Sequence, residues 1–197
     1  IFTIFVYNIL FLSLFFAENI LYFAYDLPME KLKSVARTLK PSPRMPVLFV
    51  GHGNPMNAIS DNDITRMWQK IGSNLPQAQA IVVMSAHWQT RGTHVTDAPT
   101  QEIIYDFYGF PQELYEVEYK AQGSPTLAAE LQKAFLAYEA KLDSSWGLDH
   151  GTWSVMKHLA PEPQIPVLQI SIDATKSLED LLQQFKDLRP LRDNGVI

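Results

Sequence analysis

Two histidines in this sequence have the residue type and spacing to bind one metal ion. His52 follows an apolar run at residues 45–50 (MPVLFV), and His87 comes shortly after a second run at residues 80–84 (AIVVM). Neutral imidazole is the commonest protein ligand for transition metals, and open α/β sheets bind ligands beyond the carboxyl ends of their strands. The 35 residues between the histidines fit one strand–helix–strand unit, whose strands would lie about 4.8 Å apart. Either histidine alone would more often be an ordinary loop residue, but together they predict a metal site.

A third histidine, His150, lies between Asp149 and Gly151 and has two interpretations. It is a metal ligand, an acid–base group or a substrate donor that Asp149 orients as a neighbouring carboxylate. Alternatively, the segment is the start of a helix with Asp149 as its N-cap. The residue types alone leave both open. Of the remaining histidines, we expect His94 to be a solvated loop residue and His158 to be structural.

Composition narrows the kinds of site that the chain can hold. The 197 residues include no cysteine, which excludes disulfides, thiolate metal sites and cysteine nucleophiles. Histidine, carboxylate and water ligands suit iron, manganese or zinc. A net charge of −5 gives no sign of a nucleic-acid partner. The sequence also lacks the common P-loop, serine-hydrolase and zinc-protease motifs.

The elements that must position the histidines follow an α/β pattern. Short apolar runs predict buried strands, and apolar residues at helical spacing predict helices, the first capped by Asp61 or Asn62. The final residues, 194–197, predict a turn that enters another strand. We therefore predict an α/β fold with a mostly parallel central sheet flanked by helices and incomplete at the C-terminus. The predicted strands are 45–50, 80–84 and 166–172, and the predicted helices are 64–71, 124–135, 152–159 and 178–188.

The N-terminal region differs from the rest of the chain. Residues 1–28 are almost uncharged and strongly apolar, and residues 29–44 form a basic leader before the globular region at 45–197. The first segment is either a membrane anchor, for which about 17 apolar residues is the lower limit, or an extension that precedes a start at Met29. The basic leader would keep the globular part of an anchored chain in the cytoplasm. We expect a cytoplasmic protein that contacts a membrane only if residues 1–28 are a true anchor.

Five segments in order resemble class III extradiol ring-cleavage dioxygenases, specifically the branch that includes DOPA 4,5-dioxygenases. One such motif would be weak evidence, but an ordered series of five is strong. The segments are residues 45–57 (MPVLFVGHGNPMN), 85–92 (SAHWQTRG), 104–111 (IYDFYGFP), 147–153 (GLDHGTW) and 166–171 (PVLQIS).

The resemblance implies a non-haem metal enzyme that opens a catechol ring, such as that of DOPA, with O₂. The metal would be Fe(II), although zinc often occupies this position in family structures, and no organic cofactor is implied. It further implies that His52 and His87 are metal ligands and that His150 is a catalytic or substrate-binding residue. The pocket loops that it implies contain Asn54, Trp88, Tyr105, Asp106, Phe107 and Asp149.

The chain departs from the family in one respect. The family has a further active-site histidine and another metal-binding residue in later segments, which we expect beyond Ile197. Two histidines bind metal weakly, so we expect little or no ring cleavage from this chain. The alternatives are a zinc-dependent hydrolase on a similar α/β scaffold, or a non-catalytic protein that binds a metal or an aromatic ligand.

Overall fold

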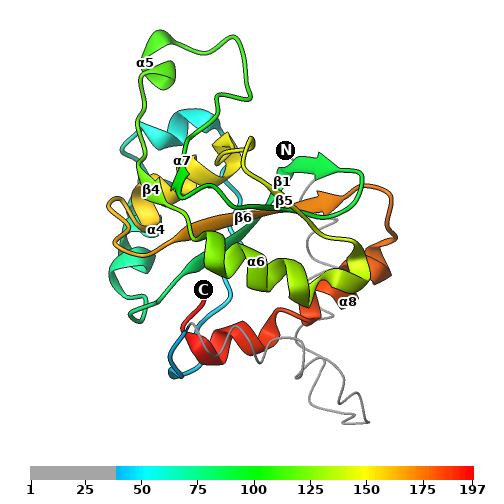
Figure 1. Ribbon diagram of the computed structural model, residues 1–197. Helices are drawn as coiled ribbons and strands as arrows, with labels where there is room; N and C mark the ends of the chain where they lie inside the picture. Colours follow the sequence, from blue (N-terminus) through cyan, green and yellow to red (C-terminus); the bar gives the residue numbers. More distant parts are fainter. Residues whose placement is uncertain (1–38) are drawn as a thin grey trace.

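The computed structural model describes residues 39–197, which form a mixed sheet with helices on both faces (Figure 1). The sheet has the strand order β1-β6-β2-β5, in which β1–β6 and β2–β5 are parallel and β2–β6 is antiparallel. Two short strands, β3 and β4, form a separate antiparallel pair. The predicted fold class, with a mostly parallel sheet, is confirmed. The strands are β1 (Ile81–Thr90), β2 (His94–Thr96), β3 (Thr100–Gln101), β4 (Ala121–Gln122), β5 (Lys141–Asp143) and β6 (Val167–Asp173).

The four predicted helices are present, and a polar side chain caps each of them. Asn62, Ser124, Asp149 and Ser177 accept hydrogen bonds from backbone N–H groups of the first turns, which have no partner inside the helix. The α-helices are α4 (Asp63–Ser73), α5 (Gln112–Tyr115), α6 (Pro125–Ala134), α7 (His150–Leu159) and α8 (Leu178–Lys186), and the 3₁₀ helices are η1 (Pro55–Ala58), η2 (Leu136–Tyr138) and η3 (Arg189–Asn194).

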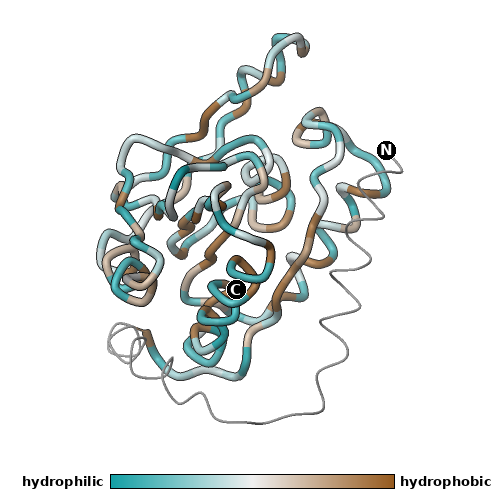
Figure 2. The backbone as a smooth tube through the Cα atoms, turned by 90° about the vertical axis from the view of Figure 1, so that its right-hand side faces the viewer, coloured by the Kyte–Doolittle hydropathy of each residue, from teal (hydrophilic) through white to brown (hydrophobic). Residues whose placement is uncertain are grey.

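Each face of the sheet has its own apolar core. Leu127 and Leu131 of α6 pack with Leu168 and Ile170 of β6 on one face. On the other face, Trp153 of α7 belongs to a cluster that also includes side chains of α4 and β1. Hydrophobic residues are concentrated along the central strands (Figure 2), and α7 lies on the opposite side of the sheet from α6 and α8 (Figure 1). The sheet therefore separates the helix that begins with His150 from the α6 core.

The prediction of a strand at residues 45–50 is wrong. The segment alternates, with Leu48 and Val50 partly buried and Val47 and Phe49 65% and 70% exposed. It belongs to no strand of the described sheets. The apolar pattern correctly indicated that one side of the segment is buried. A strand also requires a hydrogen-bonded neighbour, and the pattern of apolar residues cannot show whether such a neighbour exists.

Strand β1 is longer than predicted, and it changes the position of His87. Pairing with β6 is irregular between Met84 and Gln89, where β1 advances five residues while β6 advances two. His87 therefore lies within an irregular stretch of the strand and not beyond its end. Bulges of this kind bend a strand and redirect its side chains, often beside functional sites.

The last described residues make the predicted turn and then pair with β1. Gly195 has a φ of +78°, a conformation that glycine adopts without steric cost. Val196 forms a parallel bridge with Ala80, and the backbone N–H of Val82 donates to Ile197. The predictions for residues 1–28 and for most of the basic leader fall outside the described residues. Among residues 39–197, no helix is both long and apolar enough to cross a bilayer.

Candidate metal centre

Three histidines from separate parts of the chain converge at one point. The Nε2 atoms of His52 and His87 are 2.8 Å apart. The ring of His150 has its centroid 4.9 Å from that of His52 and 4.1 Å from that of His87. One potential ligand atom from each residue lies within 4.8 Å of the others. The predicted convergence of His52 and His87 is thus present, and His150 joins them.

The donor set fits a transition metal. Two nitrogen atoms at about 2.1 Å from one ion can be at most about 4.2 Å apart, so small ring movements would bring all three histidines to one ion. Burial, together with the nearby His150 and His87, lowers the pKa of His52 to about 4, so its imidazole is neutral at pH 7 and available as a ligand. Nδ1 of His52 is buried and has no hydrogen-bond partner. A bound metal ion would give this ring a partner.

His52 is held by the loop that follows it. Gly53 has a φ of +65°, which turns the chain into the η1 helix. The side-chain amide of Asn57 then donates to the backbone oxygen of His52 at 3.0 Å. Asn54, one of the predicted pocket residues, caps η1 by accepting from the backbone N–H of Met56 at 2.9 Å.

His87 is tied to the start of α7 through a buried serine. The hydroxyl of Ser85 accepts from the backbone N–H of His87 at 3.2 Å and donates to Oδ1 of Asp149 at 2.8 Å. Burial raises the pKa of Asp149, although Ser85, Gln169 and the backbone of Thr152 all donate to its carboxylate. A fully buried polar cluster therefore lies beneath the His87 backbone.

A different carboxylate, Asp106, contacts His150. One oxygen of Asp106 accepts from the backbone N–H of His150 at 2.8 Å, and the other lies 3.0 Å from its Nδ1. Burial alone would raise the pKa of Asp106, but the contacts with His150 keep it below its usual value. The interpretation of Asp149 as the N-cap is therefore right, and the expectation that it orients the imidazole is wrong.

The remaining predicted residues divide between the histidine cluster and other regions. Phe107 lies edge-on to His150 with ring centroids 5.6 Å apart. Tyr105 packs on Phe107 and donates its hydroxyl to the backbone oxygen of Val117 at 2.7 Å. Trp88 is buried and stacks on Trp146 at 5.3 Å, so its ring contacts lie outside the cluster.

The two histidines outside the cluster give opposite outcomes. His94 is a partly buried residue of β2, 3.3 Å from Oδ2 of Asp143, so the solvated-loop prediction is wrong. His158 lies in the last turn of α7, and both of its ring nitrogens form hydrogen bonds, Nδ1 with the side chain of Gln69 and Nε2 with the backbone oxygen of Asn57. The structural role predicted for His158 agrees with these contacts.

Three supporting residues were missed by sequence reasoning. Gln169 is a polar residue within an apolar strand sequence, and Ser85 directly follows one, which is the signal that could have identified them. Gly151 is the third, because a Cβ at this position would lie 2.5 Å from Cδ2 of His87. Its place next to a candidate histidine was a weaker signal.

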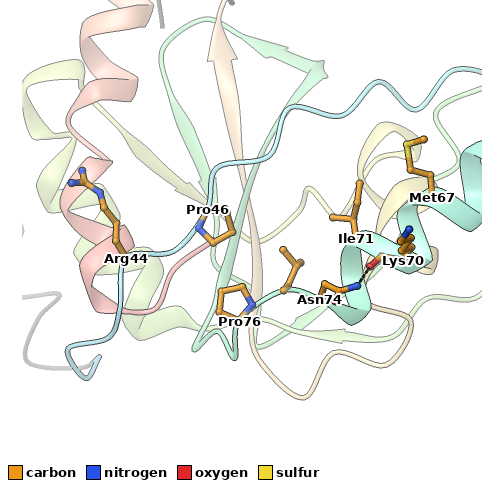
Figure 3. A pocket seen from close by; sticks show the side chains of 8 residues that line it. Arg44, Pro46, Met67, Lys70, Ile71, Asn74 and Pro76 are labelled. Carbon is orange, nitrogen blue, oxygen red and sulfur yellow. Dashed lines mark hydrogen bonds between the residues drawn. The ribbon is translucent and has the colours of Figure 1, made fainter. Parts of the chain in front are cut away.

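A groove on the surface lies apart from the histidine cluster. It has a volume of about 560 Å³ and runs between α4 and the segment near Pro46 (Figure 3). None of the predicted site residues lines it. The groove is therefore separate from the histidine cluster. It is lined by Arg44, Pro46, Met67, Lys70, Ile71, Asn74, Leu75 and Pro76.

Comparisons with known proteins agree on one family. The family model described as the catalytic LigB subunit of aromatic ring-opening dioxygenase matches residues 44–192. The chain is 49% identical to a 4,5-DOPA dioxygenase extradiol of Escherichia coli K12, over 79% of this chain and 58% of that protein. It is 38% identical to the protein of that name from Beta vulgaris, over 76% of this chain and 58% of that protein.

A solved structure also resembles this chain. A crystal structure of an uncharacterised Escherichia coli K12 protein matches with a TM-score of 0.65 and 45% identity, covering 78% of this chain and 57% of that one. The chain thus spans somewhat more than half the length of these relatives.

Proposed function

Because the chain belongs to the family of the catalytic LigB subunit of aromatic ring-opening dioxygenases, we propose that it carries the metal-binding part of an extradiol dioxygenase. The reaction is the opening of a catechol ring with O₂. The observation that supports this most directly is the convergence of His52, His87 and His150. The names of the relatives favour a DOPA-like catechol and give no support to the hydrolase alternative.

In this proposal the metal is Fe(II), held by His52 and His87. Bound Fe(II) supplies open coordination positions for the two catechol oxygens and for O₂. We propose that His150 accepts a catechol proton, a role supported by the contact of its imidazole with the rings of His52 and His87. Asp106 would stabilise the imidazolium that this transfer produces, since its carboxylate lies 3.0 Å from Nδ1.

An aromatic neighbour suits the proposed substrate. Phe107 lies edge-on to His150, and aromatic side chains beside polar groups are typical of pockets for flat ligands. His87, however, is an exposed residue. A site open to solvent on one side excludes water poorly, which weakens its electrostatic interactions. We therefore propose that this chain binds the metal but cleaves the ring slowly.

The first test is metal binding under anaerobic conditions. Fe(II) titrated into the chain should bind with a stoichiometry of one. His52→Ala and His87→Ala should each weaken binding by tenfold or more, because each removes a proposed ligand, whereas His94→Ala should bind as the unaltered chain does. Unchanged affinity in both ligand variants would refute the proposed site.

Turnover is tested separately with DOPA or catechol in air. We expect slow, Fe(II)-dependent formation of yellow ring-fission product, measured by absorbance together with O₂ uptake. His52→Ala should produce none. Equal product from that variant would show that the reaction does not occur at these histidines.

A further inference from the structure

Asn57 uses all of its polar groups in hydrogen bonds that link three elements. Its side-chain amide donates to the backbone oxygen of His52 at 3.0 Å, and its Oδ1 accepts from the side chain of Asn62 at 3.0 Å. Its backbone N–H donates to Asn54 at 2.9 Å, and its backbone oxygen lies 2.8 Å from Nε2 of His158. Because Asn57 is also buried, this arrangement fixes it with respect to η1, α4 and α7.

The turn before η1 is shaped to admit this amide. Gly53 has a φ of +65°, and a Cβ at that position would lie 3.2 Å from Nδ2 of Asn57. A side chain at position 53 would therefore press on the group that holds His52. The backbone turn at Gly53 and the buried amide of Asn57 therefore act together to hold the backbone of His52.

His158 holds the other side of Asn57. A carbonyl oxygen can only accept, so Nε2 of His158 carries the proton and donates to Asn57. Nδ1 then accepts from the side-chain amide of Gln69, 3.3 Å away in α4. His158 thus joins the C-terminal turn of α7 to both α4 and the loop of His52.

Helix α7 consequently sets the positions of two members of the cluster. His150 is its first residue, and His158, near its end, reaches His52 through Asn57. We propose that Asn57 and His158 are positioning residues for the metal ligand His52. The inference rests on the proposed metal site, and it assigns to both residues a role that requires no contact with the metal.

The test compares Co(II) binding among matched variants of the full chain. Asn57→Asp keeps the size of the side chain but replaces the donor to His52 with an oxygen, and His158→Phe removes the donor to Asn57. Each should weaken Co(II) binding by about tenfold or more and alter the visible Co(II) spectrum. His158→Gln offers another N–H donor and should restore binding in part.

Ser124→Ala is the control for a purely structural effect. It removes the cap of α6, on the other face of the sheet, and should lower the free energy of unfolding while the affinity for Co(II) and the spectrum stay unchanged. Wild-type affinity and spectrum in Asn57→Asp and His158→Phe would overturn the inference. If Asn57→Asp does not fold, the difference in Co(II) affinity between His158→Phe and His158→Gln tests the positioning role.

The same titration separates this inference from the proposed function. Failure of the unaltered chain to bind Co(II), or unchanged binding in His52→Ala, would refute the metal site itself and this inference with it. Binding that is lost in His52→Ala but intact in Asn57→Asp and His158→Phe would refute the positioning role alone.

Discussion

At the scale of single residues, Gly151 leaves the space that the ring of His87 occupies. We predict that Gly151→Ala weakens metal binding by tenfold or more, because the new Cβ would lie 2.5 Å from Cδ2 of His87 and would displace the ring. The ring is the end of a side chain and can turn aside. Alanine is also favoured over glycine within a helix by about 0.5–1 kcal/mol. Oδ1 of Asp149 would lie 3.2 Å from the same Cβ and would have to shift slightly, so the free energy of unfolding should change little, measured by urea denaturation beside a metal titration.

Gly51→Ala is the matched control for this substitution. A Cβ at Gly51 would meet no atom within 4 Å, and its φ lies outside the left-handed region, so metal binding should stay as in the unaltered chain although His52 is the next residue. Wild-type metal affinity in Gly151→Ala would show that the close approach to His87 is not needed.

Individual residues of the candidate site differ in how well the sequence could predict them. His52 and His87 could be predicted because their type and spacing pointed to a shared ion. The partner of His150 could not. Asp149 is adjacent in sequence, but its carboxylate caps α7 and binds Ser85, while Asp106 reaches the imidazole from 44 residues away. The contact between Asp106 and His150 depends on the path of an irregular segment, and no helical or strand pattern in the sequence describes that path.

At the scale of elements, α4 and α7 pack closely at Gly72. A Cβ on Gly72 would lie 2.0 Å from the backbone oxygen of Leu159, and backbone atoms cannot turn aside. We predict that Gly72→Ala lowers the free energy of unfolding by about 1–3 kcal/mol, despite the higher helix propensity of alanine. It should also weaken metal binding, because α7 carries both His150 and His158.

Urea denaturation and Co(II) titration of the same variant measure both effects. Ser73→Ala, at the next and exposed position, should change stability by no more than about 0.5 kcal/mol. A Gly72→Ala chain as stable as the Ser73→Ala chain would contradict the close packing of the two helices.

Helices were the elements that the sequence predicted best. Asn62, Ser124 and Asp149 mark helix starts through local chemistry, so short stretches of sequence contain the signal. The strand predicted at residues 45–50 failed because pairing depends on a distant neighbour. The extension of β1 through His87 was missed for a related reason, since its irregular stretch contains Ser85, Ala86 and Gln89 and lacks a continuous apolar run.

A bound metal should stabilise the folded chain as a whole. A ligand that binds only the native state at 100 times its dissociation constant adds about 2.7 kcal/mol, and the three histidines come together only in the folded structure. We predict that Zn(II) or Co(II) raises the melting temperature by several degrees, measured by thermal denaturation. His52→Ala should show a much smaller rise, and an equal rise in that variant would place the stabilising ion elsewhere.

The separation of the three histidines along the chain also governs when the site forms during folding. Residues 52, 87 and 150 meet only after the loops between them have closed, which costs entropy before any contact is gained. Because these residues are so distant in sequence, we expect the site to assemble late in folding, after the rate-limiting step. A bound metal would then stabilise mainly the native state. It would slow unfolding and leave the refolding rate nearly unchanged.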